Sequence, residues 1–268
     1  MAGNDSYTND TDSASYRTLF LQYGLAPQHI SLHRDNYRTH ADISTSQGKY
    51  NLDLINNADI IFFNGGDQAK HIRSWLNDDG SPNQLLKSLK ERAINDEIIC
   101  SGSSAGSMIW GEQTFGDGSA FGTLYFRNSI GLAPKNVTDA DINGTGLADV
   151  RNGTKSLQYD YNAGKMPAFN FLPFPTDTHF NARGRLGRLI PVLVDFRRDF
   201  AFGVDENTSL YYDNGVGSVY GWNGVTFVDL TYAQISSTSY FKASNITGHY
   251  LTHGDQFLFN GRKPISAK

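Results

Sequence analysis

Two short apolar runs, each ending in a turn of glycine or other small residues, most constrain what this chain can fold into. The first covers residues 59–63 and enters the turn of Gly65 and Gly66, after which a helical pattern extends to about Leu76. The second covers residues 97–100 and is also followed directly by a helix. Continuous apolar strands are typical of a sheet covered on both faces, and strands alternating with helices indicate parallel pairing. We therefore expect an α/β fold with a doubly wound, mostly parallel sheet.

The rest of the chain divides into a helical first part, an irregular middle and a strand-rich end. Further helices are expected from residue 12 or 13 to about 23 and over 50–57, 84–95 and 184–196. Further strands are expected over 29–33, 200–204, 209–212, 218–222 and 225–230, with Asn-Gly hairpin turns at 214–215 and 223–224. We treat residues 1–268 as one domain with C-terminal β-hairpins. Residues 1–12 are expected to be flexible, and the Gly- and Asn-rich residues 115–175 to form an insertion or lid.

Charge and residue content exclude several classes of function. The formal net charge of −4 argues against non-specific binding to nucleic acid or to a membrane surface. No apolar run is long enough to cross a membrane. The single cysteine, Cys100, excludes an internal disulfide and is expected to be a small buried apolar group. The histidines lack a matching cluster of acidic ligands, so we expect neither a metal nor another cofactor.

Asparagine-linked glycosylation motifs bear on the location of the protein. Seven Asn-x-Ser/Thr motifs occur, where the composition predicts about three by chance. This excess favours a secreted glycoprotein over a cytoplasmic protein, and a polar, Asn-rich surface is the alternative. The first twenty residues lack the basic and apolar regions of a signal peptide. The motifs begin at Asn4, Asn9, Asn136, Asn143, Asn152, Asn207 and Asn245.

Residues 98–110 bear most directly on chemistry, because a buried strand runs into a turn of small residues and then a helix. In this turn Gly102 and Gly106 flank Ser104 in the pattern G-x-S-x-G. The pattern is typical of a nucleophile elbow, which exposes a serine hydroxyl above the carboxyl edge of the sheet. The N–H groups of Ala105 and Gly66 are then expected to bind an oxyanion. The alternative is a Gly/Ser-rich loop that only lets the strand and the helix pack closely.

Residues 177–188 supply a base and a concentration of positive charge. A serine hydroxyl needs a neutral imidazole to accept its proton, and we expect His179 to fill this role. The arginines at 183, 185 and 188 suit fork-like binding of carboxylates, and a solvated helix face is their alternative. Gln68, after the first strand, is expected to reach a polar group of a substrate.

The motifs FFNGGDQ, GSSAGS, DTHFNARGRLGRL and GVDENTSL, in this order, resemble the cyanophycinases and their relatives among the serine peptidases that include aspartyl dipeptidases. The resemblance covers about residues 13–212, apart from the insertion. It implies a fold related to class I glutamine amidotransferases, with Ser104 as nucleophile and His179 as base. It implies hydrolysis of a polymer of β-aspartyl-arginine units. The resemblance further implies a substrate pocket lined by Gln68, Asp177, Arg183, Arg185 and Arg188.

The chain departs from this family pattern in three places. Thr178 stands where the family has glutamine, which shortens one contact in the pocket. The family begins with one or two strands that end in glycines, and we expect this chain to start after them. The long insertion separates Ser104 from His179 and is expected to narrow access for a polymer. For the third member of the triad, Asp117 is the first choice, Glu112 the second and Glu206 the third.

These patterns predict a serine-type peptidase that hydrolyses amide bonds of Asp-containing peptides without metal or cofactor. Its expected partner is a peptide or polymer substrate, not nucleic acid or a membrane, and a homodimer stays open. One alternative is an exopeptidase of the aspartyl dipeptidase kind that acts on small peptides. The other is a secreted binding protein that has kept the fold and lost catalysis.

Overall fold

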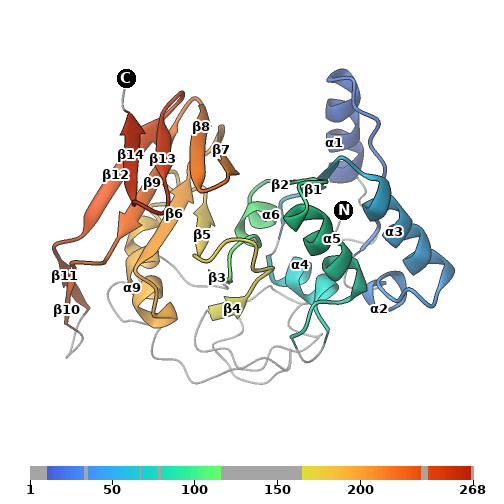
Figure 1. The fold of residues 1–268 in the computed structure, drawn as a ribbon, viewed down its shortest axis with the longest axis horizontal. Helices are drawn as coiled ribbons and strands as arrows, with labels where there is room; N and C mark the ends of the chain where they lie inside the picture. Colours follow the sequence, from blue (N-terminus) through green and yellow to red (C-terminus); the bar gives the residue numbers. More distant parts are fainter. Residues whose placement is uncertain are drawn as a thin grey trace. The chain divides into compact units, whose positions relative to one another are not determined.

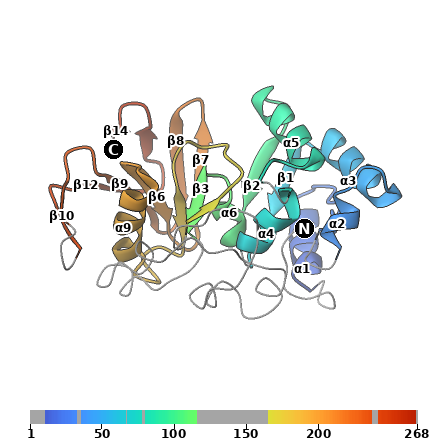
Figure 2. The ribbon, with the colours of Figure 1, turned by 90° about the horizontal axis from the view of Figure 1, so that it is seen from below.

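The computed structural model describes residues 11–32, 36–66, 68–77, 80–115, 165–236 and 241–266. Figure 1 labels its helices and strands, and Figure 2 shows them from below. The described residues form two compact units. The first contains those up to Trp110 together with Met166–Phe171, and the second contains the remainder. The prediction of a single domain stays a prediction, and most of the predicted flexible end and of the predicted insertion lies outside the described residues.

The first unit is built around a pair of parallel strands, β1 (Ile60–Phe63) and β2 (Ile99–Gly102). They are joined through two helices, and a short helix follows β2 directly (Figure 1). This order confirms the predicted alternation of strands and helices. The helices of the unit are α1 (Thr11–Gln22), α2 (Tyr37–His40), α3 (Ser46–Asn57), α4 (Gln68–Trp75), α5 (Gln84–Ile94) and α6 (Ala105–Met108).

Strand β1 contacts aromatic side chains on both faces, which explains its continuous apolar run. Successive side chains of a strand point to opposite faces of the sheet. The ring of Phe62 lies 4.8 Å from that of Tyr16 and 5.1 Å from that of Phe20, both on α1. The ring of Phe63, on the other face, lies 5.0 Å from that of Trp75 on α4. A strand with alternating polar and apolar residues would place polar side chains against the aromatic rings on one of these faces.

Side-chain caps determine where two helices of the first unit begin. The hydroxyl of Thr45 accepts a hydrogen bond from the N–H of Gly48 at 2.9 Å. Helix α3 therefore begins at Ser46, four residues before the predicted start at 50. The side chain of Asn83 caps α5 in the same way, so this helix begins at the predicted residue. Residues 29–32, by contrast, form no regular strand, which makes that part of the predicted strand wrong.

The second unit contains two larger sheets and a two-stranded one, apart from Met166 and Pro167 of β4, which belong to the first unit. The six-stranded sheet has the order β12-β9-β6-β5-β3-β4, in which β3, β5 and β6 are parallel and β6, β9 and β12 antiparallel. The four-stranded sheet, β14-β13-β8-β7, is antiparallel throughout. The strands are β3 (Gln113–Phe115), β4 (Lys165–Pro167), β5 (Thr176–Thr178), β6 (Phe200–Val204), β7 (Thr208–Asp213), β8 (Val216–Gly221), β9 (Gly224–Asp229), β10 (Gln234–Ser236), β11 (Lys242–Ser244), β12 (Thr247–Thr252), β13 (Gln256–Leu258) and β14 (Lys263–Ser266).

Strand β6 is buried between two apolar layers of the second unit. Its Phe200 and Phe202 pack into a core with Phe257, from the four-stranded sheet. Its Ala201, which points to the opposite face, packs against α9 (Leu186–Phe196) through Leu189. The six-stranded sheet is therefore covered by a helix on one face and by the second sheet on the other.

The C-terminal turns test the hairpin predictions separately. Asn214 and Gly215 have φ of 46° and 84° and join β7 to its antiparallel neighbour β8, which confirms the first hairpin. The predicted hairpin at Asn223 and Gly224 is wrong. There the chain passes from β8 in one sheet to β9 in the other, and the two strands have different hydrogen-bonded neighbours.

The arrangement confirms a mixed α/β fold with parallel strands and C-terminal antiparallel strands. In the part of the chain that the structure describes, no helix has the length and apolar character needed to cross a membrane.

Candidate active site

Ser104 occupies the sharp turn between β2 and α6 in the first unit. Its backbone has φ of 51° and ψ of −120°, a combination that residues with a side chain rarely adopt. Such a conformation costs about 1 to 3 kcal/mol and tends to occur at functional sites. The structure thus has the strained strand-to-helix turn that the G-x-S-x-G pattern predicts.

Gly102 and Gly106 are required by close backbone approaches at this turn. A Cβ atom on Gly102 would lie 2.2 Å from the carbonyl oxygen of Gly106. A Cβ atom on Gly106 would lie 2.2 Å from the carbonyl oxygen of Phe63, in the neighbouring strand. Both contacts are with backbone, which cannot move aside without disturbing β1 or α6. A side chain at either position would therefore collide with backbone atoms.

Replacing Gly106 by alanine is expected to lower the free energy of unfolding by about 1 to 3 kcal/mol or more, as overpacking does. The added methyl group would displace the backbone of β1 near Phe63. Urea unfolding of the wild type and the variant measures the difference. Gly248→Ala is the matched control, because its nearest contact would be an ordinary 3.9 Å to the carbonyl oxygen of Phe227. Equal losses in the two variants would contradict the argument.

The loop after β1 lies directly beside Ser104. The N–H of Ser103 donates to the carbonyl oxygen of Phe63 at 2.9 Å, so the two strands end together. A Cβ atom on Gly65 would lie 3.3 Å from the Cβ of Ser104. Gly66 follows with φ of 136°, which only glycine adopts readily. The carboxyl ends of β1 and β2 therefore meet at one edge, as the parallel pairing predicts, and Gln68 begins α4 a short distance along the chain.

Helix α1 contributes a contact to the elbow that sequence reasoning missed. The hydroxyls of Tyr16 and Ser103 are hydrogen-bonded at 2.8 Å. The two residues are 87 positions apart, and no sequence motif links them. The motif GSSAGS does show that a second hydroxyl stands beside Ser104, but it does not show what binds it.

Cys100 does not offer a competing nucleophile at this edge. Burial raises the pKa of its thiol to about 12, so the reactive thiolate is scarce at neutral pH. It is a partly buried, free cysteine in β2, in line with the small apolar group expected from the sequence.

His179 lies in the second unit, directly after β5. Its φ of 49° makes a tight turn at the carboxyl end of that strand. Its Nδ1 is 2.9 Å from Oε1 of Glu206, which follows β6. Strands β5 and β6 are parallel neighbours, with Thr178 opposite Val204, so both side chains leave the same edge of the sheet. A carboxylate on Nδ1 holds the ring in one orientation and favours the tautomer with its proton on Nδ1.

The three candidates for the triad acid have different surroundings. Glu206 binds His179. Glu112 forms an ion pair with Arg198. Asp117, the first choice from the sequence, lies outside the described residues, and its assignment stays a prediction. Glu206 lies two residues beyond β6, and only the parallel pairing of β6 with β5 brings it to His179.

The turn that carries His179 is fastened to β6 by a neighbouring carboxylate. Asp205 accepts hydrogen bonds from the backbone N–H of Asn181 at 3.0 Å and from its side-chain amide at 2.8 Å. The hydroxyl of Tyr250 also donates to Asp205, at 2.9 Å. Partial burial, together with this carboxylate, raises the pKa of Tyr250. The network links β6 and β12 to the turn.

Asp177 and two of the predicted arginines form one buried network. Arg188 donates from Nε and Nη2 to the two oxygens of Asp177, at 2.7 and 2.6 Å. Arg185 donates to Asp177 at 3.0 Å and to the carbonyl oxygen of Thr178 at 2.7 Å. Burial lowers the pKa of Arg185 to about 10; Asp177 opposes this shift, and Arg188 and Arg183 add to it. Arg183 is exposed, and the role of this set in binding substrate stays a prediction.

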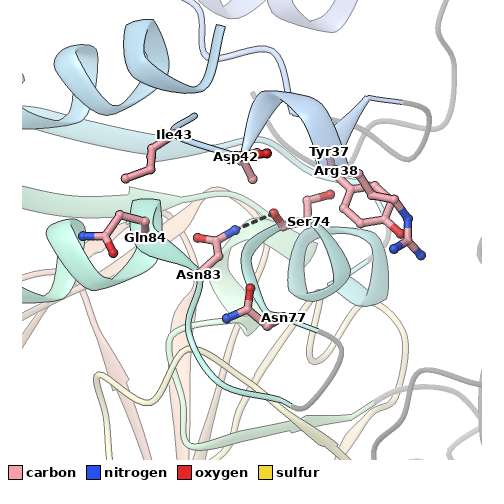
Figure 3. Close-up of a pocket in the computed structure, with 9 residues that line it drawn as sticks. Tyr37, Arg38, Asp42, Ile43, Ser74, Asn77, Asn83 and Gln84 are labelled. Carbon is pink, nitrogen blue, oxygen red and sulfur yellow. Dashed lines mark hydrogen bonds between the residues drawn. The ribbon is translucent and has the colours of Figure 1, made fainter. Parts of the chain in front are cut away.

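A separate pocket of about 390 Å³ lies within the first unit (Figure 3). The side-chain amide of Asn83 donates to the carbonyl oxygen of Ser74 at 3.1 Å on its wall. Its lining includes none of the site residues predicted from the sequence, so we assign it no part in the chemistry. The lining residues are Tyr37, Arg38, Ala41, Asp42, Ile43, Ser74, Asn77, Asn83 and Gln84.

Metal ions in proteins are usually bound by acidic, histidine and cysteine side chains. Among the residues that the structure describes, no three of them gather closely enough to hold a metal ion.

Comparison with known proteins adds sequence relatives to this geometry. Cyanophycinase from a Nostoc species is 24% identical over 237 residues, which are 86% of this chain and 66% of that protein. Cyanophycinase from Trichormus variabilis is 24% identical over 214 residues, 77% of this chain and 59% of its own length. The chain thus spans about two thirds or less of the length of these relatives.

A solved structure and a family model complete the comparison. The crystal structure of a peptidase from an acI-B1 Actinobacterium has a TM-score of 0.58 at 15% identity, over 95% of this chain and 80% of that one, which is a likeness of fold. The family model described as Peptidase family S51 matches residues 3–138, just over half of the chain. The chain therefore belongs to peptidase family S51.

Proposed function

We propose that this protein is a serine-type peptidase with Ser104 as nucleophile, His179 as general base and Glu206 as the carboxylate that orients the imidazole. The observation that carries the proposal is the strained backbone of Ser104 at the carboxyl edge of β2. The hydrogen bond between His179 and Glu206, at the carboxyl edge of two other parallel strands, supports it. Such a division of roles is what acyl transfer by a serine hydroxyl requires.

The charge that develops on the substrate carbonyl needs donors beside Ser104. We assign this role to the N–H groups of Ala105 and Gly66. Ala105 is the first residue of α6, and N–H groups in the first turn of a helix lack acceptors within the helix. The loop of Gly65 and Gly66 approaches Ser104 closely enough to supply the second donor. Preorganised donors of this kind are usually a large part of catalysis.

The substrate that we propose is a peptide rich in aspartate, of the β-aspartyl-arginine type found in cyanophycin. Two relatives are named cyanophycinases, which supports this substrate class. The class I glutamine amidotransferase type of fold, which the sequence motifs imply, is part of the same proposal. Arg183 is exposed after the His179 turn and can reach a substrate carboxylate. Asp177 holds Arg185 and Arg188 in fixed positions beside that turn. Gln68, at the start of α4, is the proposed amide contact.

Release of dipeptides from purified β-aspartyl-arginine polymer tests this substrate. We expect hydrolysis of the polymer and little hydrolysis of α-linked aspartyl dipeptides, with both followed by amine release. Preference for the small α-linked peptides would instead favour an exopeptidase of the aspartyl dipeptidase kind. No hydrolysis of either, together with no reaction of Ser104 with a fluorophosphonate, would leave a binding protein and overturn the proposal.

Glu206→Gln is expected to lower kcat by about 10²- to 10⁴-fold, because an amide can hold the wrong tautomer of His179 and cannot stabilise its charged form. Steady-state hydrolysis by the wild type and the variant measures the change. Glu112→Gln is the matched control: it removes a carboxylate that is paired with Arg198 and should leave kcat within about tenfold. A larger loss of kcat in Glu112→Gln than in Glu206→Gln would show that Glu206 is not the carboxylate that orients His179.

A further inference from the structure

His71 is a buried imidazole in the first unit that the proposed reaction does not use. It lies on α4 and has no exposed surface. Its Nε2 is 2.9 Å from the carbonyl oxygen of Asn64, the residue between β1 and Gly65. Its ring packs edge-on against Phe63, with centroids 5.7 Å apart. The imidazole is therefore held directly behind the loop that borders Ser104.

The carbonyl of Asn64 needs a donor that the sheet cannot supply. The preceding carbonyl, of Phe63, accepts from the N–H of Ser103, which is the last bond between the ends of β1 and β2. Asn64 lies beyond that bond and is fully buried, and a buried carbonyl without a donor is costly. On its other side, α6 is so close that a Cβ on Gly106 would lie 2.6 Å from this oxygen. The imidazole of His71 fills the position of the missing donor.

The protonation of His71 follows from its burial and its partner. Burial lowers its pKa to about 4, so the ring is neutral at neutral pH and carries one N–H. A carbonyl oxygen only accepts, so the proton resides on Nε2. Nδ1 has no hydrogen-bond partner among the described residues. Burying Nδ1 without a hydrogen-bond partner costs free energy that an apolar side chain at this position would not cost. The contribution of the imidazole is therefore the N–H that it donates to the carbonyl oxygen of Asn64.

The hydrogen bond to Asn64 also controls its neighbour. The C=O of Asn64 and the N–H of Gly65 belong to one planar trans peptide and point in opposite directions. A donor that fixes the direction of the Asn64 oxygen therefore also fixes the direction of the Gly65 N–H. Two successive glycines give this loop wide conformational freedom, and Gly66 already has φ of 136°. Without an outside restraint, the peptides beside Ser104 would have several orientations.

We propose that His71 is a positioning residue, which acts through the carbonyl of Asn64 to hold the loop of Gly65 and Gly66 with its N–H groups toward the oxyanion at Ser104. The inference rests on the proposed function, in which this loop supplies an oxyanion donor. His71 touches neither the substrate nor the serine hydroxyl. Its effect falls on the chemical step and not on substrate binding, because negative charge develops on the carbonyl oxygen only as the tetrahedral intermediate forms.

Two variants at position 71 test the proposal. His71→Leu removes the donor, whereas His71→Gln keeps an N–H near the place of the imidazole Nε2. We expect His71→Leu to lower kcat per active site by about 10- to 100-fold with KM within about threefold, and His71→Gln to recover most of the loss. Active sites are counted by titration with a fluorophosphonate, so that misfolded protein does not enter kcat. A merely structural role would lower the titrated fraction and leave kcat per site unchanged.

A measurement on the wild type keeps the test independent of how the variants fold. Nitrogen-15 NMR of the imidazole is expected to show a neutral ring with its proton on Nε2. A proton on Nδ1, or a charged ring at neutral pH, would overturn the inference, as would a His71→Leu variant with kcat per site within about twofold of the wild type. A wild type without peptidase activity contradicts the proposed function. Normal wild-type hydrolysis with an unchanged His71→Leu variant contradicts only the role of His71.

Discussion

Replacing Ser104 by alanine is expected to reduce peptide hydrolysis by at least about 10³-fold, because the variant lacks the hydroxyl that we propose as the nucleophile. The backbone conformation of the turn is set by Gly102, Gly106 and the strands, so the variant should fold as the wild type does. Amine release from the substrate measures the first effect, and thermal unfolding measures the second. Loss of activity without loss of stability is the expected combination.

Ser103→Ala is the matched control for that experiment. Ser103 is adjacent and also carries a hydroxyl, but this hydroxyl is hydrogen-bonded to that of Tyr16. We expect the control to keep kcat within about tenfold of the wild type, because it loses one supporting contact and not the nucleophile. Unchanged hydrolysis by Ser104→Ala would show that Ser104 is not the nucleophile. Complete loss of hydrolysis in Ser103→Ala alone would contradict the assignment in the same way.

Replacing Asp177 by asparagine is expected to lower the free energy of unfolding by about 3 to 5 kcal/mol, the usual effect of removing one partner of a buried ion pair. Asp177 is 1% exposed and receives both arms of the Arg188 guanidinium as well as one of Arg185. The variant would leave those positive charges buried without compensation. Urea unfolding, fitted with a common slope, gives the difference from the wild type.

The ion pair of Asp199 with Arg262 provides the comparison. Its N–O distance, 2.8 Å, is similar, but the side chain of Asp199 is 54% exposed. Water screens such a pair, so Asp199→Asn should cost no more than about 1 kcal/mol. A loss in Asp177→Asn as small as that would show that the arginines find other partners, and would return Asp177 to a direct role in the substrate pocket.

The elbow was predictable because every part of it is local in sequence. An apolar run, two glycines flanking a serine and a following helix are all contained in residues 98–110. Backbone sterics then leave little choice: the φ of 51° at Ser104 and the contacts behind Gly102 and Gly106 follow from a strand that turns at once into a helix. The adjacency of Gly65 was also predictable, because parallel strands end at a common edge.

The surroundings of the site were not predictable in the same way. Glu206 ranked third for the triad acid because its distance in sequence from His179, 27 residues, says nothing about the pairing of β5 with β6. The Asn-Gly pair at 223–224 suggested a hairpin, yet the chain changes sheets there because β9 is hydrogen-bonded between β6 and β12. Both outcomes depend on strand order, which short-range patterns do not encode.

Local patterns were thus enough to predict most of the helices, the strands β1 and β2 and the strained serine between β2 and α6, since chain geometry and side-chain size act between near neighbours. The partners of the polar side chains around the site were settled by tertiary packing: Tyr16 with Ser103, Glu206 with His179, and His71 with Asn64. In each case a polar atom takes whichever complementary group the folded backbone brings within hydrogen-bond distance, and for His71 that atom belongs to a fully buried side chain.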